Sequence, residues 1–567
     1  MHPGKRSFPG EKWFGQMKPV QARIKRTRIG WRIGRSGLMR RIGVWFFVAL
    51  AASVCGLLSG AHAFTDTVKD LYIGAEAVFI GRLEDVQVSS RHLFVFPAEY
   101  AVTLSVQRAW KGAGPGSVTV TRDNRREEGG SLIARGESYL VITSENASWI
   151  KDIEDAKDEL DYLNSIYLSV PQPSGPYAVG TKNFCFVDSS RPESFTPAPD
   201  DYREVAFRVW YPVLRVDDER LPVPLLENAS ELGQVYATYL PLPPGTLDVL
   251  SSVETHSYRD ADMLESTELF PVVLFSHGYG AGMMQSTVLM EELASHGYVV
   301  VSVAHAYETS PFLGEDGIIK GFDPGNEEFL LRAKERSSTL GIQREIVATQ
   351  DPHELELLLR EHSERRPKTI ESLRIWADDV SFVLDKLEEM SCGGGFFGGK
   401  LDTGRVGVLG HSFGGAASAQ VCLTDERCLA GINIDGLGLG DILDENLAKP
   451  FMFVHHDNIA ATNKTPNRLF FERSEGPGYL VLVEGTRHLN FSDASIPGYA
   501  SIFLLPAETL GEIDGRRCLE IQNRYVTAFF DKHLRGLDSH LLDGLASGYP
   551  EVQIWTRFPE SPGVLTD

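Results

Sequence analysis

The pattern of apolar and polar positions divides residues 64–560 into two parts. Up to residue 165, short β-branched and apolar runs alternate with turn-forming residues, which is typical of a small all-β domain. These runs are residues 77–80, 100–106, 116–120 and 139–142. A helix-like pattern follows at 154–166, and a stretch rich in Pro, Gly and Ser at 166–180 predicts a linker. The first part is therefore expected to be a separate β domain over residues 64–165.

Beyond residue 180, strand-like and helix-like segments alternate. The predicted strands are residues 205–211, 272–276, 298–303, 405–409, 430–434, 451–455 and 479–483, and the predicted helices are 287–295, 370–390, 415–423 and 516–533. Some strands, such as 272–275, are apolar throughout, as strands buried on both faces are. The alternation predicts an α/β domain over residues 181–560, with a mostly parallel sheet covered by helices on both faces.

Residues 306–369 interrupt this rhythm with a long, charged insertion that contains helix-like stretches at 326–336 and 353–362. Long insertions of this kind often cover a site as a lid. Four leucines of the second stretch fit a lipid-facing stripe or the ordinary core of the insertion, so both interpretations stay open. They are Leu355, Leu357, Leu358 and Leu359.

The first 63 residues carry 12 Lys or Arg residues and one acidic residue. An Arg-Arg pair at 40–41 precedes an apolar run at 44–52, and an Ala-His-Ala motif ends at Ala63. This order is that of a secretory signal peptide, cleaved after Ala63, with Met39 as the expected start. The alternative is a retained membrane anchor, but the apolar run is short for a span. A soluble protein, secreted or periplasmic, is therefore expected.

Charge and cysteine usage argue against a nucleic-acid-binding protein and against a cysteine-based zinc site. Without residues 1–63 the chain has 43 basic and 76 acidic residues, a net charge of about -33, so it lacks the basic surface that nucleic-acid binding needs. Five of the six cysteines lie outside the signal peptide, and none has the C-x-x-C spacing of a zinc site. Cys422 and Cys428 are close in sequence and are the pair expected to form a disulfide.

The segment 410–414, Gly-His-Ser-Phe-Gly, stands between a predicted strand and a predicted helix. A strand, a tight turn and a helix form the context of a nucleophile elbow, which exposes a serine at the carboxyl edge of a sheet. Glycines on both sides permit a turn that would crowd a Cβ atom. Ser412 is therefore the candidate nucleophile, and the α/β domain is expected to have the α/β-hydrolase fold.

A serine hydroxyl needs a base, and the base needs an acid that orients it. In this fold the acid and then the histidine follow the serine along the chain. Asp435 comes directly after the predicted strand 430–434 and is the candidate acid, rather than a turn residue before Gly436. His488 lies in the loop after the strand 479–483 and is the candidate base.

Other titratable residues downstream of Ser412 are weaker candidates. His455 and His456 are interpreted as strand-end residues, and Asp457 beside them is an alternative acid. No third ligand stands at a useful spacing from these residues, so no metal site is expected. Asp441 and Asp444 lie in a glycine-rich loop and are expected to be solvated.

The oxyanion of the reaction needs two backbone N–H donors, one from the residue after the nucleophile and one from the loop after an early strand. Phe413 and Tyr279 are the candidates, and Tyr279 lies in the glycine-containing loop 275–282. No Lys-Ser/Thr pair follows this loop, so it is not a phosphate cradle. The glycine-rich run at 393–399 precedes a strand, so it is expected to be a flexible connection. No cofactor is expected.

Segments in four places together resemble the platelet-activating-factor acetylhydrolase family, also called lipoprotein-associated phospholipase A2. They are residues 276–278, 292–300, 410–416 and 488–493, and residues 175–180 resemble that family's opening segment. The resemblance covers about residues 173–540. It implies Ser412, Asp435 and His488 as the catalytic triad, with Tyr279 and Phe413 as oxyanion donors.

Two departures from the family pattern concern the substrate pocket rather than the triad. The family often has an acidic-His-Arg-Asp stretch after the strand that ends near residue 303, and only His305 matches it. The family also has a bulky aromatic residue shortly after the acid, whereas this chain has Gly436, Leu437 and Gly438 there.

The β domain has a resemblance of its own. Residues 75–82, 106–112 and 136–141 resemble the netrin-like module, an OB-type barrel also found in tissue inhibitors of metalloproteinases. The module's usual cysteines are missing here. An accessory or packing domain is therefore expected, rather than a protease-binding one.

The first functional hypothesis is a secreted, calcium-independent serine ester hydrolase. The family resemblance implies that it cleaves short-acyl or oxidised phospholipid-type esters, as a 1-alkyl-2-acetylglycerophosphocholine esterase does, and a lipid substrate implies contact with a lipid interface. The alternative keeps the mechanism, with small soluble or polymeric esters as substrates. A hypothesis from another class is a binding protein whose β domain carries the function on a non-catalytic scaffold. The oligomeric state is left open.

Overall fold

The computed structural model describes the backbone of residues 77–88, 99–111, 117–123, 138–144 and 147–152, and both backbone and side chains over most of residues 168–558. The second part has gaps at residues 199, 215–219, 237–246, 248–249, 252, 314–318, 324, 393, 458–465, 504, 506–508 and 545–547. The predicted signal peptide, its cleavage site and the helix-like pattern at 154–166 lie outside the described residues.

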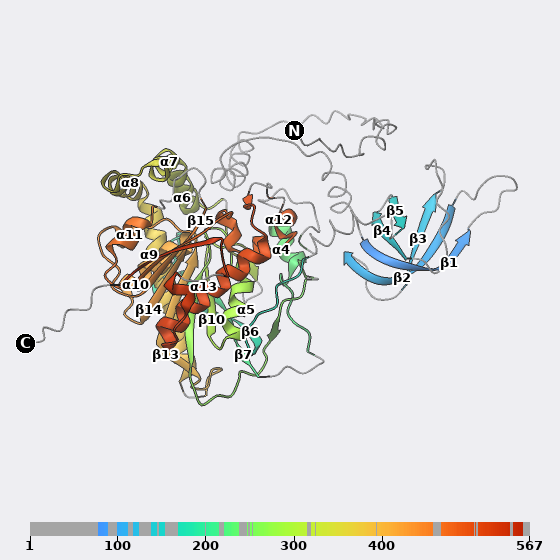
Figure 1. The fold of residues 1–567 in the computed structure, drawn as a ribbon, viewed down its shortest axis with the longest axis horizontal. Helices are drawn as coiled ribbons and strands as arrows, with labels where there is room; N and C mark the ends of the chain where they lie inside the picture. Colours follow the sequence, from blue (N-terminus) through green and yellow to red (C-terminus); the bar gives the residue numbers. More distant parts are fainter. Residues whose placement is uncertain are drawn as a thin grey trace, which may run out of the picture.

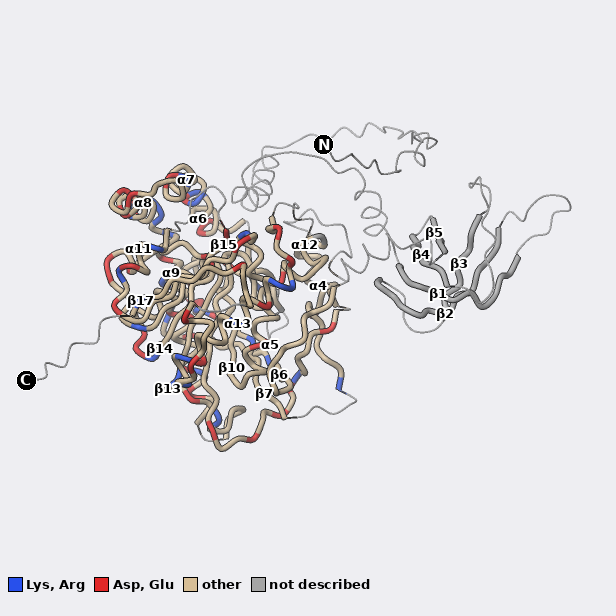
Figure 2. The backbone as a smooth tube through the Cα atoms, viewed as in Figure 1, with Lys and Arg blue, Asp and Glu red and all other residues tan. Residues whose placement is uncertain are grey.

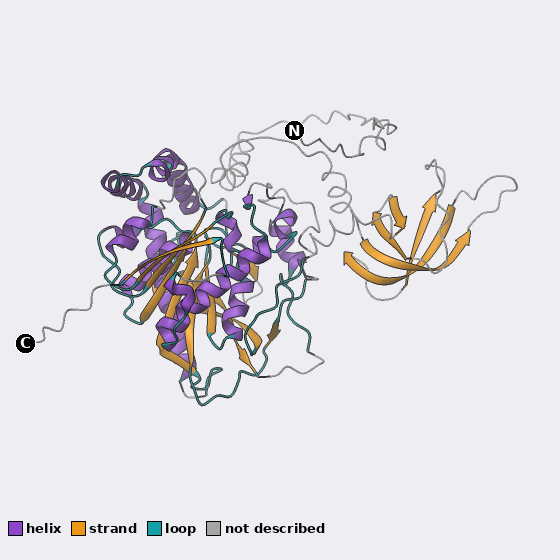
Figure 3. Ribbon diagram, in the orientation of Figure 1, coloured by secondary structure: helices purple, strands orange, loops and turns teal. Residues whose placement is uncertain are grey.

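Five strands near the N-terminus form an antiparallel sheet of their own, in the order β3-β2-β1-β4-β5 (Figure 3). They are β1 (Ala77–Val88), β2 (Glu99–Lys111), β3 (Ser117–Asp123), β4 (Ser138–Ser144) and β5 (Ala147–Asp152). Each of the four predicted runs falls on one of β1 to β4, and β5 was not predicted. The assignment of this sheet to a netrin-like barrel stays a prediction.

A larger mixed sheet organises the rest of the described chain, in the order β17-β16-β15-β14-β13-β9-β10-β7-β6-β8. Its strands are β6 (Ala178–Pro192), β7 (Tyr202–Val213), β8 (Ser257–Arg259), β9 (Phe270–Ser276), β10 (Val299–His305), β13 (Leu401–His411), β14 (Cys428–Ile434), β15 (Phe451–His456), β16 (Gly478–Val483) and β17 (Val552–Arg557). The central strands from β10 to β16 pair in parallel. All seven predicted strands of this domain are confirmed, whereas β6, β8 and β17 were not predicted.

Helices cover both faces of this sheet (Figure 1). Successive residues of β9 point to opposite faces: Val272 packs in the core with α9 and α10, and Val273 packs in the core with α5 and α13. These helices are α5 (Thr287–Ser295), α9 (Pro367–Ser391), α10 (Phe413–Thr424) and α13 (Gly515–Arg535). The predicted doubly covered α/β architecture is therefore confirmed.

The predicted linker is wrong at its C-terminal end, because β6 already begins at Ala178. The residues before β6 also pack against the domain. Leu168 and Val170 are buried, the Ser174 backbone N–H donates to Glu292 at 2.8 Å, and the Tyr177 N–H donates to the Ser295 carbonyl at 3.1 Å. This segment is thus fixed along the end of α5.

The insertion folds into three helices, α6 (Glu327–Ser338), α7 (Leu340–Ala348) and α8 (Pro352–Glu364), of which α7 was not predicted. Sequence signals explain two of the starts, because the Asn326 side chain caps α6 and Asp351 caps α8. Leu355 and Leu359 join the main hydrophobic core, whereas Leu357 is 55% exposed. Leu358 is partly buried and packs against the same core, so the core interpretation is confirmed for three of the four leucines. Basic and acidic residues are mixed along these helices (Figure 2).

Shorter elements complete the described fold. They are α4 (Ala229–Tyr236), β11 (Phe312–Leu313), β12 (Ile319–Lys320), α11 (Arg468–Arg473), α12 (Tyr499–Ile502) and the 3-10 helices η3 (Gly440–Leu443), η4 (His488–Phe491), η5 (Asp493–Ser495) and η7 (His540–Asp543). None of the helices in the described part of the chain has both the length and the apolar character that crossing a membrane requires.

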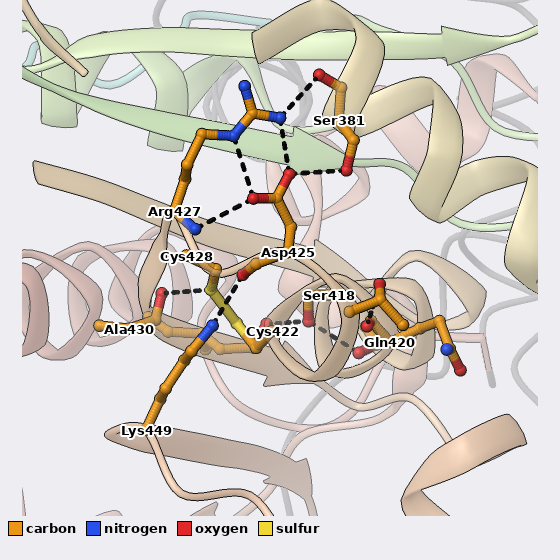
Figure 4. The surroundings of a disulfide bond; sticks show 12 residues. Ser381, Ser418, Gln420, Cys422, Asp425, Arg427, Cys428, Ala430 and Lys449 are labelled. Carbon is orange, nitrogen blue, oxygen red and sulfur yellow. Dashed lines mark hydrogen bonds and ion pairs between the residues drawn. A yellow bond between two sulfur atoms is a disulfide. The ribbon is translucent and has the colours of Figure 1, made fainter. Parts of the chain in front are cut away.

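The predicted disulfide between Cys422 and Cys428 is confirmed, with the two Cα atoms 5.2 Å apart (Figure 4). It joins the last turn of α10 to the first residue of β14. The turn inside this loop is held by Asp425, whose carboxylate accepts from Arg427, and Arg427 also pairs with Asp385 of α9 at 2.6 Å. The link between α10 and β14 is therefore fixed by covalent and ionic contacts together.

Candidate active site

Ser412 stands on a sharp turn between β13 and α10, with φ of 57° and ψ of -121°. The two glycines of the motif leave room for this turn. A Cβ atom on Gly410 would lie 2.1 Å from the Gly414 carbonyl oxygen, and one on Gly414 would lie 2.1 Å from the Ser276 carbonyl oxygen. The Ser412 N–H donates to the Ile434 carbonyl at 2.8 Å. The predicted elbow is thus present and is fixed to the neighbouring strand.

The three predicted residues of the triad meet at the carboxyl ends of β13, β14 and β16. His488 Nε2 lies 3.0 Å from Ser412 Oγ, and His488 Nδ1 lies 2.5 Å from Asp435 Oδ2. Because each contact is within hydrogen-bond distance, a proton can pass from the serine to an imidazole that the carboxylate orients.

Asp435 sits on a tight turn of its own, with φ of 55°. The turn is held from both sides, since Asn433 Oδ1 accepts from the Gly436 N–H at 2.8 Å and Asn467 Nδ2 donates to the Gly436 carbonyl at 2.5 Å. A Cβ atom on Gly436 would lie 2.0 Å from the Ser412 carbonyl oxygen. This glycine therefore lets the acid turn pack directly on the elbow.

His455 and His456 are not mere strand-end residues, because both contact Asp435. His456 Nδ1 lies 2.7 Å from each carboxylate oxygen, its backbone N–H donates to Oδ1 at 3.1 Å, and His455 Nδ1 lies 3.6 Å from Oδ1. Burial alone would raise the pKa of Asp435, but these histidines and His488 hold it well below its usual range. The carboxylate therefore stays ionised.

Asp457, the alternative acid, has a different role. One of its carboxylate oxygens accepts from the Gly485 N–H at 3.3 Å, and its own N–H donates to Thr486 Oγ1 at 3.3 Å. These contacts fix the loop that leads to His488. The structure thus places Asp435, and not Asp457, against the His488 ring.

Asp435, His456 and His488 are also residue types that bind metal ions, and their donor atoms lie within 4.8 Å of one another. However, Nδ1 of each histidine lies within hydrogen-bond distance of the Asp435 carboxylate. Such a bond requires a proton on each Nδ1, which leaves no lone pair there for a metal. The arrangement fits a hydrogen-bonded acid–base group.

The two residues that carry the predicted oxyanion donors lie close together, because their rings are in contact. Among the described residues, neither the Tyr279 N–H nor the Phe413 N–H has a hydrogen-bond acceptor within the protein. The two rings meet edge to face with centroids 5.7 Å apart. The loop of Tyr279 is fixed by the Gly280 N–H, which donates to the Glu308 carbonyl at 2.9 Å, and Gly280 has a left-handed φ of 77°. Two backbone donors are thus left available beside Ser412.

Buried aromatic rings stack against the loop of Tyr279. Trp376 of α9 lies parallel to the Tyr279 ring, with centroids 6.2 Å apart, and parallel to the His305 ring, with centroids 3.9 Å apart. Trp376 Nε1 donates to Glu308 Oε2 at 2.9 Å. His305 Nδ1 lies 3.0 Å from Asp379, which pairs with the buried Arg203 at 2.7 Å. His305 therefore belongs to a network of side chains that supports the loop of Tyr279.

The insertion borders the same loop. The guanidinium carbon of Arg336 in α6 lies 3.7 Å above the centre of the Tyr279 ring, and Phe329 of α6 stacks on that ring with centroids 6.4 Å apart. A cation over an aromatic face is an attractive contact. The expected position of the insertion near the site is therefore supported by direct contacts of α6.

Comparison with known proteins places this site in a family. The family model described as platelet-activating factor acetylhydrolase, isoform II, matches residues 163–314 and 383–549, which is more than half of the chain. The chain belongs to this family. The resemblance noted from the motifs is thereby confirmed, and the netrin-like module stays a prediction.

Individual relatives agree with this assignment. Platelet-activating factor acetylhydrolase from Cavia porcellus is 24% identical over 439 residues, which cover 75% of this chain and 92% of the relative. A probable 1-alkyl-2-acetylglycerophosphocholine esterase from Arthroderma benhamiae is 26% identical over 432 residues, 68% of this chain and 92% of the relative. The solved ferulic acid esterase from Streptomyces cinnamoneus, at 27% identity, has a TM-score of 0.53 and covers 68% of this chain and 99% of its own. These similarities support an α/β-hydrolase fold and an ester-hydrolase function.

The gap between the two matched segments contains α6, α7, α8 and the first part of α9. The insertion helices therefore lie in a segment that the family model does not match, and α6 of this segment contacts Tyr279.

Proposed function

We propose that this protein is a serine ester hydrolase that cleaves short-acyl or oxidised phospholipid-type carboxylic esters through an acyl-enzyme. The observation that carries the proposal is the geometry of Ser412, His488 and Asp435, with the unpaired N–H groups of Tyr279 and Phe413 beside them. A non-catalytic scaffold would need none of these contacts, so they favour an enzyme over a binding protein.

In the first half of the reaction, Ser412 Oγ attacks the ester carbonyl carbon while His488 Nε2 takes the hydroxyl proton. The developing oxyanion is stabilised by the N–H groups of Tyr279 and Phe413. The carbonyl then re-forms, the alcohol leaves with the proton from His488, and an acyl-Ser412 remains. Asp435 stays ionised throughout and stabilises the imidazolium of His488.

In the second half, His488 takes a proton from a water molecule, and the resulting hydroxide attacks the acyl carbon. The tetrahedral intermediate collapses, the carboxylic acid leaves, and Ser412 Oγ regains its proton from His488. His488 thus carries each proton that moves in the cycle, first from Ser412 to the alcohol and then from water to Ser412.

The test of the mechanism is labelling by a fluorophosphonate probe, which phosphonylates an activated serine. Wild type is expected to be labelled, and Ser412→Ala is expected to remain unlabelled. A folded His488→Gln variant is expected to be labelled far more slowly than wild type. An unlabelled wild type would show that the proposed chemistry is wrong.

The substrate class rests on the family and on the names of the relatives. It is tested by comparing 1-alkyl-2-acetylglycerophosphocholine with the 2-palmitoyl and the oxidised short-chain analogues. A kcat/KM for the acetyl or oxidised ester well above that for palmitoyl is expected, and equal rates would contradict the short-acyl preference.

A second candidate substrate class is small soluble or polymeric esters. It is favoured by the ferulic acid esterase, nearly all of whose chain is covered by the similarity, and by the insertion that the family model does not match. Methyl ferulate and a soluble polyester in the same assay separate the two, since faster hydrolysis of either would favour this second class.

We also propose that the protein is exported. The signal-like segment before Ala63 and the disulfide between Cys422 and Cys428 support this, because disulfides persist in oxidising compartments. Fusion of residues 39–70 to an alkaline phosphatase that lacks its own signal is expected to give phosphatase activity, which requires export. A fusion that stays inactive inside the cell would contradict the proposal.

A further inference from the structure

Two side chains outside the triad connect the oxyanion loop to the loop of the base. Gln285, just before α5, accepts with Oε1 from the Gly278 N–H at 2.6 Å, and its Nε2 donates to His411 Nδ1 at 2.7 Å. His411 Nε2 in turn lies 2.9 Å from the carbonyl oxygen of His488. An unbroken chain of hydrogen bonds therefore runs from Gly278 through Gln285 and His411 to His488.

The partners fix the protonation of His411. A side-chain amide nitrogen only donates and a backbone carbonyl only accepts, so His411 carries its proton on Nε2 and accepts at Nδ1. Burial, and then the neighbouring charge of His488, lower the pKa of His411 to about 3. The imidazole thus stays neutral with one tautomer, and the direction of each bond in the chain is defined.

The connection is tightly packed at Gly278. A Cβ atom on this glycine would lie 3.3 Å from His411 Nδ1, 3.4 Å from Gln285 Nε2 and 3.4 Å from Ser412 Cβ. The Gly278 carbonyl is held as well, because it accepts from the Ala281 N–H at 2.9 Å and lies 2.8 Å from His277 Nδ1. Both peptide groups that flank Gly278 are therefore fixed.

The backbone of Gln285 is held at both of its polar groups. Its N–H donates to the Gly282 carbonyl at 2.9 Å, and its carbonyl accepts from the Asp493 N–H at 2.9 Å. Asp493 begins η5, one residue after the end of η4, the 3-10 helix that His488 begins. The side chain of Gln285 therefore extends from a fixed anchor that is itself tied to the base loop.

We propose that Gln285 and His411 are positioning residues, which hold the N–H of Tyr279 and the ring of His488 in the mutual geometry that the tetrahedral intermediate needs. In a trans peptide the N–H of Tyr279 points opposite to the carbonyl of Gly278, so fixing Gly278 aims the oxyanion donor. The inference rests on the proposed function. Neither residue touches the reacting atoms.

The main test is Gln285→Met, which keeps the length of the side chain and removes both hydrogen bonds. With a short-acyl ester, kcat is expected to fall about 10- to 100-fold, which is less than the loss of a whole oxyanion donor, while KM changes by less than about threefold. Inhibition by a trifluoromethyl ketone, which forms an oxyanion on Ser412, is expected to weaken by the same factor as kcat.

Gln420→Met is the matched control. Gln420 is also buried and also makes two side-chain bonds, donating to Asp441 Oδ2 at 2.6 Å and accepting from the Asp441 N–H at 3.1 Å, but it lies on α10 away from the chain of hydrogen bonds. The kcat of this variant and its inhibition by the ketone are expected to stay within about threefold of wild type. The bonds that it loses do not contact the residues that position the oxyanion, so their loss does not destabilise the transition state selectively.

Two substitutions separate the ends of His411. His411→Asn keeps an acceptor near the position of Nδ1, and His411→Gln keeps a donor near the position of Nε2. Each is expected to lower kcat, and Gln285→Met combined with His411→Gln is expected to lose less than the product of the two single losses, since both remove the same bond.

The outcomes separate this inference from the proposed function. If wild type neither hydrolyses esters nor reacts with fluorophosphonate, the proposed function fails. If wild type is active but Gln285→Met matches Gln420→Met, or acts through KM alone, the positioning role is wrong. Should Gln285→Met fail to fold, Gln285→Glu replaces it, because a glutamate keeps the acceptor for the Gly278 N–H. If Gln285→Glu and His411→Gln, measured as separate variants, both kept the wild-type kcat, the positioning role would equally be wrong.

Discussion

At the scale of single residues, two strained backbone positions present the nucleophile and the acid. Ser412 has φ of 57° and Asp435 has φ of 55°, which lie in a backbone region that residues other than glycine rarely adopt. Such positions cost about 1–3 kcal/mol each and persist only where neighbours fix them. Here the elbow glycines and the two asparagines at the acid turn do so.

The strain at Ser412 predicts that relieving the positive φ removes activity and raises the free energy of unfolding. Ser412→Gly and Ser412→Ala are both expected to be inactive, but the glycine variant is expected to have the higher free energy of unfolding, by about 1 kcal/mol, because only it relieves the positive φ. Urea denaturation of the two variants measures the difference. An equal or lower value for the glycine variant would show that the elbow stores no strain.

The histidine beside the acid predicts a pH dependence of stability. Burial alone would lower the pKa of His456, but the charge of Asp435 and its hydrogen bond raise it overall. A raised folded-state pKa adds stability that is fully present below the unfolded value of about 6.5 and is lost as the pH rises through the folded value. Wild type is thus expected to have a higher free energy of unfolding than His456→Gln. This difference is expected to be larger at pH 5.5 than at pH 9.

The comparison is made by urea denaturation at both pH values, with His540→Gln as the control because His540 is 97% exposed. A difference between wild type and His456→Gln that is constant with pH would contradict the ion pair with Asp435.

The candidate site shows which residues sequence reasoning reaches. Ser412, Asp435 and His488 could be predicted because each follows a recognisable strand, and parallel strands end at one edge of a sheet. The contact of His456 with Asp435 and the link from Gln285 to His411 could not, because each joins residues that no local pattern relates. Only the side-chain geometry after folding reveals them.

At the scale of elements, buried regular segments were predictable and edge segments were not. Strands such as β9 and β10 are buried throughout and read as continuous apolar runs. In β6, near one edge of the sheet, buried and exposed positions follow no regular alternation, and Gly and Pro lie close to its start. The pattern that predicted a linker up to residue 180 therefore overlaps the first residues of this strand.

The insertion helices predict a contrast between two neighbouring leucines. Leu359 of α8 is fully buried in the main core, so Leu359→Ala is expected to lower the free energy of unfolding by about 2–5 kcal/mol. Leu357→Ala, on the exposed side, is expected to change it by less than about 0.5 kcal/mol. Urea denaturation of both variants tests whether the insertion is part of the domain core, and equal effects would contradict it.

At the scale of the whole molecule, strong negative charge bears on the proposed phospholipid-type substrate. Residues 64–567 carry a net charge of about -33. Charges of one sign repel over roughly the Debye length, which is about 30 Å at 0.01 M salt and about 8 Å at 0.15 M. The molecule is therefore expected to approach an anionic lipid surface poorly when salt is low.

Vesicles of two compositions test this expectation. Hydrolysis of a short-acyl phospholipid carried in vesicles that contain 30% phosphatidylserine is expected to rise several-fold between about 0.01 M and 0.15 M salt, as screening removes the repulsion. In phosphatidylcholine vesicles the rate is expected to change little. A fall with salt in the anionic vesicles would indicate a basic docking surface instead.

The disulfide has a consequence for the order in which the protein matures. Cys422 and Cys428 are six positions apart, so the cost of closing their loop is small and no distant strand has to be in place first. The bond clamps α10 to β14 at the end opposite to the one where Ser412 and Asp435 lie. A newly synthesised chain can therefore fix the unit that carries nucleophile and acid while most of the sheet is still unpaired. Trapping of free thiols during refolding under oxidising conditions would follow that step.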